Sequence, residues 1–280
     1  GALSATATTG NITDSGALTI TGTSAFVTIA NDATITLDQG GHAFTGALLI
    51  TTNDTSTDTA GDVTISAGSS TVLDFGNSTI DGDLIATSSN ATGITDSGAM
   101  TVRGTASFQT TATNADISLG TSTLGDGTGT DTITLNTTGS TGHATLDNGT
   151  TVVALGTSAA SLVTNVGGNL TLTSGAAAGI TDSATVTVGG NLIATTDANS
   201  GVIDLGTLAV DGTIALTTHN NGAATVVNDA GLNFAASTVG GALSATATTG
   251  NITDSGALAI TGTSTFTVAN GQSVILDESS

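Results

Sequence analysis

The amino-acid sequence predicts an all-β fold, a parallel β-helix (β-solenoid) with about 22 residues per turn. The first observation is that apolar residues alternate with Thr and Ser, as in Ala17–Thr21 and Asp131–Leu135, which is the periodicity of a strand. The second is composition. The chain has 39 glycines and many threonines, which disfavour helices, and no Pro, so that every strand can donate its hydrogen bonds. The third is internal repetition on several length scales.

The composition also excludes several functions. Apolar residues make up 38% of the 280-residue chain and the mean hydropathy is +0.30, so the chain is not a disordered linker. The net charge is −21 and Arg103 is the only permanently cationic side chain, which excludes nucleic acid and anionic membranes as partners. No apolar run approaches about 18 residues, so we expect no membrane insertion. Without Cys there is no disulfide or thiolate site.

The longest repeat spans about 240 residues. Gly1–Ser24 and Gly241–Ser264 are identical except that Thr19 corresponds to Ala259. We therefore divide the chain into one complete long repeat, residues 1–240, and the start of the next, residues 241–280. The chain is expected to be an internal piece of a much longer solenoid.

A shorter repeat lies within the long one. The string Ile-Thr-Asp-Ser begins at Ile12, Ile94, Ile180 and Ile252, which predicts sub-repeats near residues 1–81, 82–167 and 168–240. We interpret the motif aspartates as Asx-type turn residues that lie about four turns apart. These aspartates are Asp14, Asp96, Asp182 and Asp254.

The finest repeat is the single turn, in which a strand that starts after a glycine recurs in steps of about 22 residues. These glycines are Gly1, Gly22, Gly46, Gly82, Gly104, Gly168, Gly190, Gly212 and Gly241. Corners such as Thr9–Asn11 and Asp14–Gly16 are expected to use positive φ or a bond from side chain to backbone. About 13 turns would make a rod about 60 Å long. Asn53–Asp62 is expected to be a polar loop, with a second irregularity between Gly120 and Gly149.

Several of these strings resemble the strand repeats of filamentous haemagglutinin-like surface proteins, which are very large secreted bacterial β-solenoids. The strings are Gly-Asn-Leu-Thr-Leu-Thr at 168–173, Gly-Asn-Ile-Thr-Asp-Ser-Gly at 10–16, and Gly-Thr at 22 and 104. The resemblance covers the whole chain through short motifs. It implies a right-handed winding, export to the cell surface, and a role in adhesion or fibre building.

No residue set predicts catalysis, a cofactor or a resident metal. His42, His143 and His219 are far apart in the chain and lie beside Gly or Asn, so we interpret them as surface turn residues. Asp126–Ile133 is one residue away from a calcium-binding nonapeptide but occurs once, which favours a plain Gly-rich turn. The loop carrying Asp54, Asp58 and Asp62 is a second, weak calcium candidate. With one cation available, we predict that the chain is not an enzyme.

The favoured hypothesis is structural: a segment of a giant, acidic, extracellular β-solenoid that forms a stiff filament, fibre or stalk at a bacterial cell surface. Its predicted partners are copies of itself, by stacking of turns and end-to-end or lateral assembly, with divalent cations bridging the acidic rods. The alternative is an adhesin shaft whose loops, such as Asn53–Asp62, contact a partner. A third hypothesis is ice binding by outward threonines. The candidate pairs are Thr6/Thr8, Thr19/Thr21, Thr34/Thr36 and Thr132/Thr134.

Overall fold

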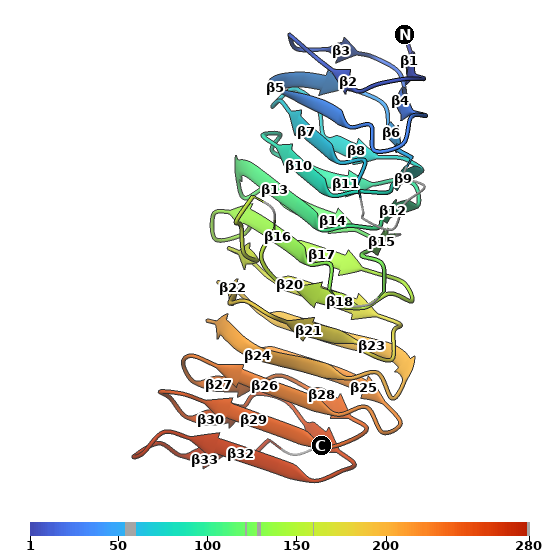
Figure 1. The fold of residues 1–280 in the computed structure, drawn as a ribbon. Coiled ribbons are helices and arrows are strands. Elements are labelled where there is room, and N and C mark those ends of the chain that lie inside the picture. The colour runs from blue at the N-terminus through green and yellow to red at the C-terminus, as the bar shows by residue number, and fades with distance from the viewer. Residues whose placement is uncertain (54–59, 121, 128–129, 159, 279–280) are drawn as a thin grey trace.

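The structure, a computed structural model, describes residues 1–53, 60–120, 122–127, 130–158 and 160–278. Within them every strand pairing is parallel, and the strands form two sheets, an 18-stranded sheet 1 and a 15-stranded sheet 2. The chain passes from one sheet to the other and back, so that about 12 turns of roughly 22 residues stack from the N-terminus to the C-terminus (Figure 1). The predicted all-β parallel solenoid is confirmed, and its right-handed winding stays a prediction. None of the described residues forms a helix, so none forms one that could cross a membrane.

Each turn has two sides, and a side takes one of two forms. A straight face is a single strand with inward and outward residues in alternation, such as the Leu84–Ser88 strand, in which the first, third and fifth side chains are buried. The straight faces are β1 (Leu3–Ala7), β4 (Ser24–Thr28), β6 (Leu48–Thr51), β7 (Val63–Ala67), β10 (Leu84–Ser88), β13 (Ala106–Thr113), β16 (Ile133–Thr138), β17 (Ala144–Asp147), β20 (Leu170–Ser174), β23 (Leu192–Asn199), β25 (Ile214–His219), β26 (Ala224–Asn228), β29 (Leu243–Ala247) and β32 (Ser264–Val268).

A bent face consists of two short segments, or of one strand whose register shifts midway. The segment pairs are β2 (Ile12–Thr13) with β3 (Thr19–Ile20), β8 (Leu73–Phe75) with β9 (Ser78–Ile80), β11 (Gly93–Asp96) with β12 (Met100–Val102), β14 (Asp116–Leu119) with β15 (Ser122–Leu124), β18 (Val153–Leu155) with β19 (Asn165–Val166), β21 (Ile180–Asp182) with β22 (Val186–Val188), β27 (Leu232–Phe234) with β28 (Ser237–Val239), and β30 (Ile252–Asp254) with β31 (Leu258–Ile260). The shifted strands are β5 (Ile35–Phe44) and β24 (Ile203–Val210), and β33 (Val274–Ile275) pairs with the bent-face strand β30. The straight strands β13 and β23 also shift register, but only after four aligned pairs, beyond Gln109 and Thr195.

Straight and bent faces alternate along the described chain except at three places. Two straight faces follow one another at β6 and β7, at β16 and β17, and at β25 and β26. Because consecutive faces lie on opposite sheets, the bent faces change sheet at each of these places, which we call face exchanges. The predicted Asn53–Asp62 loop lies between the two straight faces of the first exchange, and the irregularity predicted between Gly120 and Gly149 contains the second. The third was not predicted.

Each exchange stacks a bent face on a straight one, which breaks the regular backbone pairing. At the first exchange, β6 pairs with the bent face of the next turn at two positions only, Leu48 with Phe75 of β8 and Thr51 with Thr79 of β9. A buried hydroxyl of the bent face accepts the N–H from the middle of the straight strand. These bonds run from Ile50 N–H to Ser78 Oγ at 3.0 Å, from Leu135 N–H to Thr164 Oγ1 at 3.3 Å and from Leu216 N–H to Ser237 Oγ at 3.0 Å.

The opposite stacking, a straight face on a bent one, uses a buried Asn at the second and third exchanges. Asn148 Oδ1 accepts the N–H of Leu124 at 2.7 Å, and its Nδ2 donates to the carbonyls of Leu124 at 3.0 Å and Val152 at 2.8 Å. Asn228 Oδ1 accepts the N–H of Val210 at 2.8 Å, and its Nδ2 donates to the Val210 carbonyl at 3.1 Å. We call each of these an amide clamp. Both clamps join a buried amide to the turn before it.

The core is one continuous column of inward side chains between the two sheets. Its largest fully buried residues include four phenylalanines, and the rings of Phe75 and Phe108 meet edge to face with centroids 6.4 Å apart. Phe108 and Ala194 both occupy the third position of a straight strand and both are buried, so the core tolerates different volumes at equivalent sites.

Glycine leads most straight faces because the turns approach closely there. A Cβ on Gly46 would lie 2.7 Å from the carbonyl carbon of Gly22 in the turn before it, which no real side chain tolerates. Neither Gly10 nor Gly16 adopts a positive φ. At the Thr9–Asn11 corner the predicted alternative, a bond from side chain to backbone, is confirmed, because Asn11 Oδ1 accepts the N–H of Thr34 at 3.0 Å.

The amide clamp at the second exchange gives the first prediction. Asn148→Ala leaves the backbone groups of Leu124 unpaired in a buried place, and each such group costs about 1–3 kcal/mol. We expect a loss of at least about 2 kcal/mol in the free energy of unfolding, measured by urea denaturation. Asn148→Asp should also destabilise the chain, because its carboxylate would face two carbonyls. Asn221→Ala, at an exposed corner, is the control and should leave the midpoint unchanged. A clamp variant as stable as the control would contradict the role given to Asn148.

Candidate functional site

A column of side-chain acceptors runs along one corner of sheet 1 and ties successive turns together. At the start of each strand, or at the residue before it, a side chain accepts the backbone N–H of the corresponding residue one turn later. Asp116 Oδ1 accepts from His143 at 2.7 Å, His143 Nδ1 from Asn169 at 2.8 Å, Asn169 Oδ1 from Asn191 at 2.9 Å and Asn191 Oδ1 from Thr213 at 2.8 Å. This acceptor ladder crosses four successive gaps between turns.

A shorter acceptor ladder occupies the corresponding corner of sheet 2. Asp62 Oδ1 accepts the N–H of Asp83 at 3.0 Å, and Asp83 Oδ1 accepts the N–H of Thr105 at 2.8 Å. The pKa of the Asp83 carboxyl is raised above its ordinary value of 3.8. Burial is the main cause and the charge of Asp62 adds to it, while the hydrogen bond from the Thr105 N–H acts in the opposite direction. We call each acceptor side chain of a ladder a rung. An ionised Asp at this rung therefore stabilises the fold less than the neutral Asn amide at the equivalent rung of sheet 1.

The motif aspartates also join neighbouring turns. Asp96 accepts from the Gly120 N–H at 2.8 Å, Asp182 from the Gly206 N–H at 2.8 Å, and Asp254 from the Asp277 N–H at 3.0 Å. Each carboxylate thus caps the backbone of the next turn where its strand bends. Three of the motif aspartates thus bond to the next turn, a role that the Asx-type interpretation did not include, and successive motifs lie three and a half turns apart, close to the predicted spacing of about four.

His42 does not lie in a surface turn. It sits on β5 with a fully buried side chain, stacked on Phe44, with ring centroids 5.5 Å apart. Leu18 N–H donates to His42 Nδ1 at 2.9 Å, which places the proton on Nε2, 2.9 Å from Asp14 Oδ2. The bent face turns this position inward, and the motif carboxylate of the preceding turn lies beside it. The surface prediction for His42 is thus wrong.

The other two histidines lie elsewhere on the rod. His143 is a half-buried rung of the acceptor ladder, and His219 is exposed at the end of β25. No group of three His, Cys, Asp or Glu residues in the described part of the chain could hold a metal ion.

The calcium candidates are only partly described. Asp54 and Asp58 lie outside the described residues, and Asp62 is a rung of the sheet 2 ladder. Asp131 Oδ2 accepts the N–H of Asp126 at 3.2 Å, which closes the Gly-rich turn on itself, while Thr128 and Gly129 within it are not described. Burial raises the pKa of the Asp131 carboxyl, and the neighbouring Asp126 raises it further, against the Asp126 N–H that lowers it.

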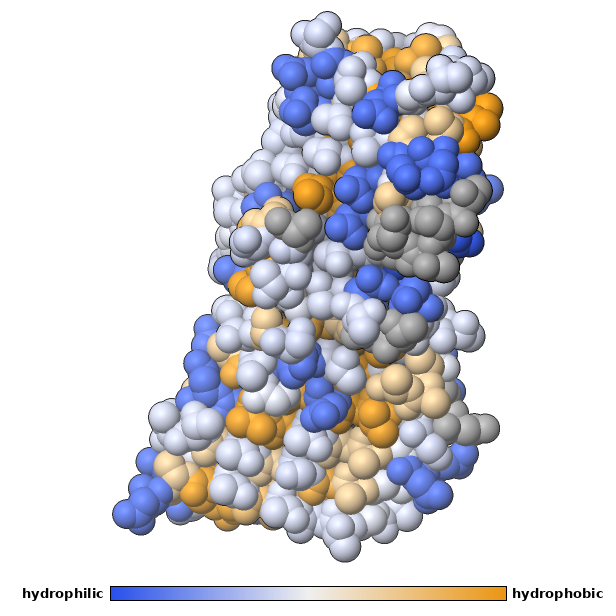
Figure 2. Space-filling model, in the orientation of Figure 1, coloured by the Kyte–Doolittle hydropathy of each residue, from blue (hydrophilic) through white to orange (hydrophobic). Residues whose placement is uncertain are grey.

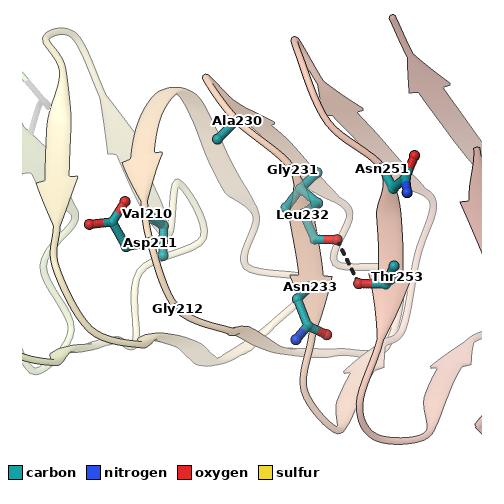
Figure 3. A pocket seen from close by; sticks show the side chains of 9 residues that line it. All are labelled: Val210, Asp211, Gly212, Ala230, Gly231, Leu232, Asn233, Asn251 and Thr253. Carbon is teal, nitrogen blue, oxygen red and sulfur yellow. Dashed lines mark hydrogen bonds between the residues drawn. The ribbon is translucent and has the colours of Figure 1, made fainter. Parts of the chain in front are cut away.

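The third exchange leaves a hollow of about 300 Å³ on the surface. Its lining comes from three successive turns, Val210–Gly212, Ala230–Asn233, and Asn251 with Thr253 (Figure 3). The Thr253 hydroxyl donates to the Leu232 carbonyl at 3.4 Å, and Asn233 Oδ1 is buried without a hydrogen-bond partner. Beside the hollow, the pairing of β27 with β25 is reduced to Phe234 and Ile214.

Most of the face seen in Figure 2 is of intermediate hydropathy, with hydrophilic and hydrophobic groups scattered over it. Arg103 Nη1 lies 3.1 Å from Asp81 Oδ1, so the one cation is used in an ion pair. Among the threonine pairs proposed for ice binding, Thr134 is fully buried and donates to Ser107 Oγ at 2.9 Å. That pair therefore does not present two hydroxyls to solvent.

One comparison with known proteins gives a match. A family model described as "Repeats of unknown function (DUF5649)" matches residues 1–51, 60–123 and 221–280, which together exceed half of the chain. No curated protein and no solved structure matches the chain.

The sheet 2 ladder gives the second prediction. Because the pKa of Asp83 is raised on folding, its carboxylate lowers the free energy of unfolding above pH 3.8 and has no such effect at lower pH. Asp83→Asn keeps the acceptor for the Thr105 N–H and removes the charge. We expect it to unfold at higher urea than the parent at pH 7, and at the same urea concentration at pH 3.

Asp83→Ala is the matched control, because it removes both the charge and the acceptor. It leaves the Thr105 N–H unpaired at a half-buried corner, and we expect a cost of about 1–3 kcal/mol at both pH values. Equal stability of the Asn and Ala variants would show that the rung contributes nothing.

Proposed function

The chain belongs to the repeat family DUF5649, and we propose that its role is structural: it supplies length and stiffness to a filament, fibre or stalk outside a bacterial cell. The observation that carries the proposal is that the joining contacts repeat from turn to turn. Backbone pairing, acceptor ladders and motif aspartates each connect a turn to the next one. A solenoid built in this way grows by adding turns, since each turn contacts only its neighbours.

The near-identical long repeats support the same proposal. Gly1–Ser24 and Gly241–Ser264 differ at one position, so a further unit adds length without a new binding surface. The extracellular location and the likeness to filamentous haemagglutinin-like proteins stay predictions. Attachment through Asn53–Asp62 also stays a prediction, because residues 54–59 of that loop lie outside the described residues.

The charge of the rod bears on how rods assemble. Twenty-two acidic residues and one Arg give a net charge of −21, which repels neighbouring rods at low ionic strength. Outward carboxylates on both sheets, such as Asp116 on sheet 1 and Asp204 on sheet 2, are exposed. Divalent cations between such groups are the proposed means of lateral assembly, and no catalytic role is proposed.

The third prediction concerns length. A chain extended by one more 240-residue unit should be longer by about 50 Å, because ten and a half turns are added at about 4.8 Å each. Electron microscopy of the 280-residue and 520-residue chains measures this difference. Particles that widen without lengthening would contradict the structural role.

The fourth prediction concerns assembly. In dilute buffer we expect static light scattering to report single rods, and added CaCl₂ to raise the scattering by lateral association. NaCl of matched ionic strength is the control, since it screens the charges without bridging them. A chelator should reverse the effect of CaCl₂. Equal scattering in the two salts would show that divalent cations do not bridge the rods.

A further inference from the structure

We infer that the rod is two-sided: equivalent surfaces of successive sub-repeats face opposite directions. The order straight, bent, straight, bent, straight, straight, bent begins at β1, at β10, at β20 and again at β29. One such unit is seven half-turns, an odd number. Each unit therefore begins on the sheet opposite to the one on which the previous unit began.

The two near-identical segments of the chain show this directly. Leu3–Ala7 forms β1 in sheet 1, whereas Leu243–Ala247, with the same sequence, forms β29 in sheet 2. Both strands turn the same residues outward, so Ser4 and Ser244 are exposed on opposite sheets. Their neighbours in the next turn, β4 and β32, are divided between the sheets in the same way.

The motif aspartates alternate as well. Asp14 follows β2 in sheet 2, Asp96 ends β11 in sheet 1, Asp182 ends β21 in sheet 2 and Asp254 ends β30 in sheet 1. The alternation is thus a property of the sub-repeat, and it does not depend on the identity of the two long segments.

The exchanges make the number of half-turns in each unit odd. Without an exchange, straight and bent faces would alternate strictly, and every unit would begin on the same sheet. One exchange per unit adds a single half-turn, and buried Ser78, Thr164 and Ser237 satisfy the backbone at the three positions. From β1 to β29 the described strands make twenty-one half-turns, which is also an odd number. The second long repeat therefore begins on the sheet opposite to the one on which the first began.

The consequence for assembly rests on the proposed function. A rod with one distinctive side can pair with a second copy through that side, and the association then stops. A rod that carries the same surface on both sides can contact a further copy on each side, so that association continues into an open raft. The partner that fits this geometry is a second copy of the same rod.

Paired labels test the two-sided display without relying on assembly. The chain has no Cys, so Ser4→Cys/Ser244→Cys and Ser4→Cys/Ala259→Cys each create two unique sites at exposed positions. Ala259 lies on β31 in sheet 1, the same sheet as Ser4 and only half a turn beyond Ser244, so twist of the rod affects the two pairs almost equally. Each variant is reacted with biotin maleimide, bound to streptavidin and viewed by electron microscopy.

We expect the relative direction of the two streptavidin labels to differ by about half a revolution between the two variants, as opposite sheets require. If both variants place their labels in the same relative direction, the two-sided display is wrong. Rods that fail to lengthen or associate would contradict the proposed function and leave this geometry unaffected.

Discussion

Parallel pairing between adjacent turns is the constraint on which the rest of the structure depends. Each strand must find the backbone partners of its neighbours at a spacing of about 4.8 Å, so a face can stack regularly only on a face of the same shape. The same closeness excludes a Cβ at Gly46, which would lie 2.7 Å from the backbone of Gly22. It also lets a short Asn or Asp side chain reach the next turn, as Asn169 and Asn191 do. Glycine and asparagine are frequent at these corners because adjacent turns are close.

A face exchange violates this constraint locally, and the sequence compensates with buried polar groups. Where β6 meets β8 and β9, the Ile50 N–H would lack a partner, and an unpaired buried donor costs about 1–3 kcal/mol. Ser78 Oγ accepts that N–H and donates its own proton to the Gly76 carbonyl at 3.0 Å. Asn148 and Asn228 solve the reverse mismatch with amides that both accept and donate. At the exchanges, Ser78, Asn148 and Asn228 thus supply the backbone partners that regular strand pairing does not.

The sequence predicted the regular part of this fold and the position of two irregular regions, but not the exchange of faces within them, for a physical reason. Straight strands that recur after one turn were found because their glycines lie about 22 residues apart. The second straight face of each exchange follows the first by only half a turn, so Gly61, Gly142 and Gly222 did not fit that step. His42 and Asn148 were missed as buried residues because Gly-His and Asn-Gly sequences are typical of exposed turns. The signal that could have found the exchanges was two straight strands too close in the sequence for a bent face between them, as with Ile214–His219 and Ala224–Asn228.

The odd number of half-turns also bears on the straightness of the rod. Within one sub-repeat the two sheets are unlike: between β1 and β9, sheet 1 carries three straight faces and one bent face, and sheet 2 carries one straight face and two bent ones. If every unit repeated that arrangement on the same sheets, a small difference in spacing between bent and straight faces would accumulate on one side and curve the solenoid. The next unit, β10 to β19, reverses the assignment, so over two units each sheet carries four straight faces and three bent ones. The difference is averaged over both sides, in keeping with the single axis along which the turns stack (Figure 1). The exchange therefore balances the two kinds of face between the sheets, and buried hydroxyls and amides bond the backbone groups that it leaves without regular partners.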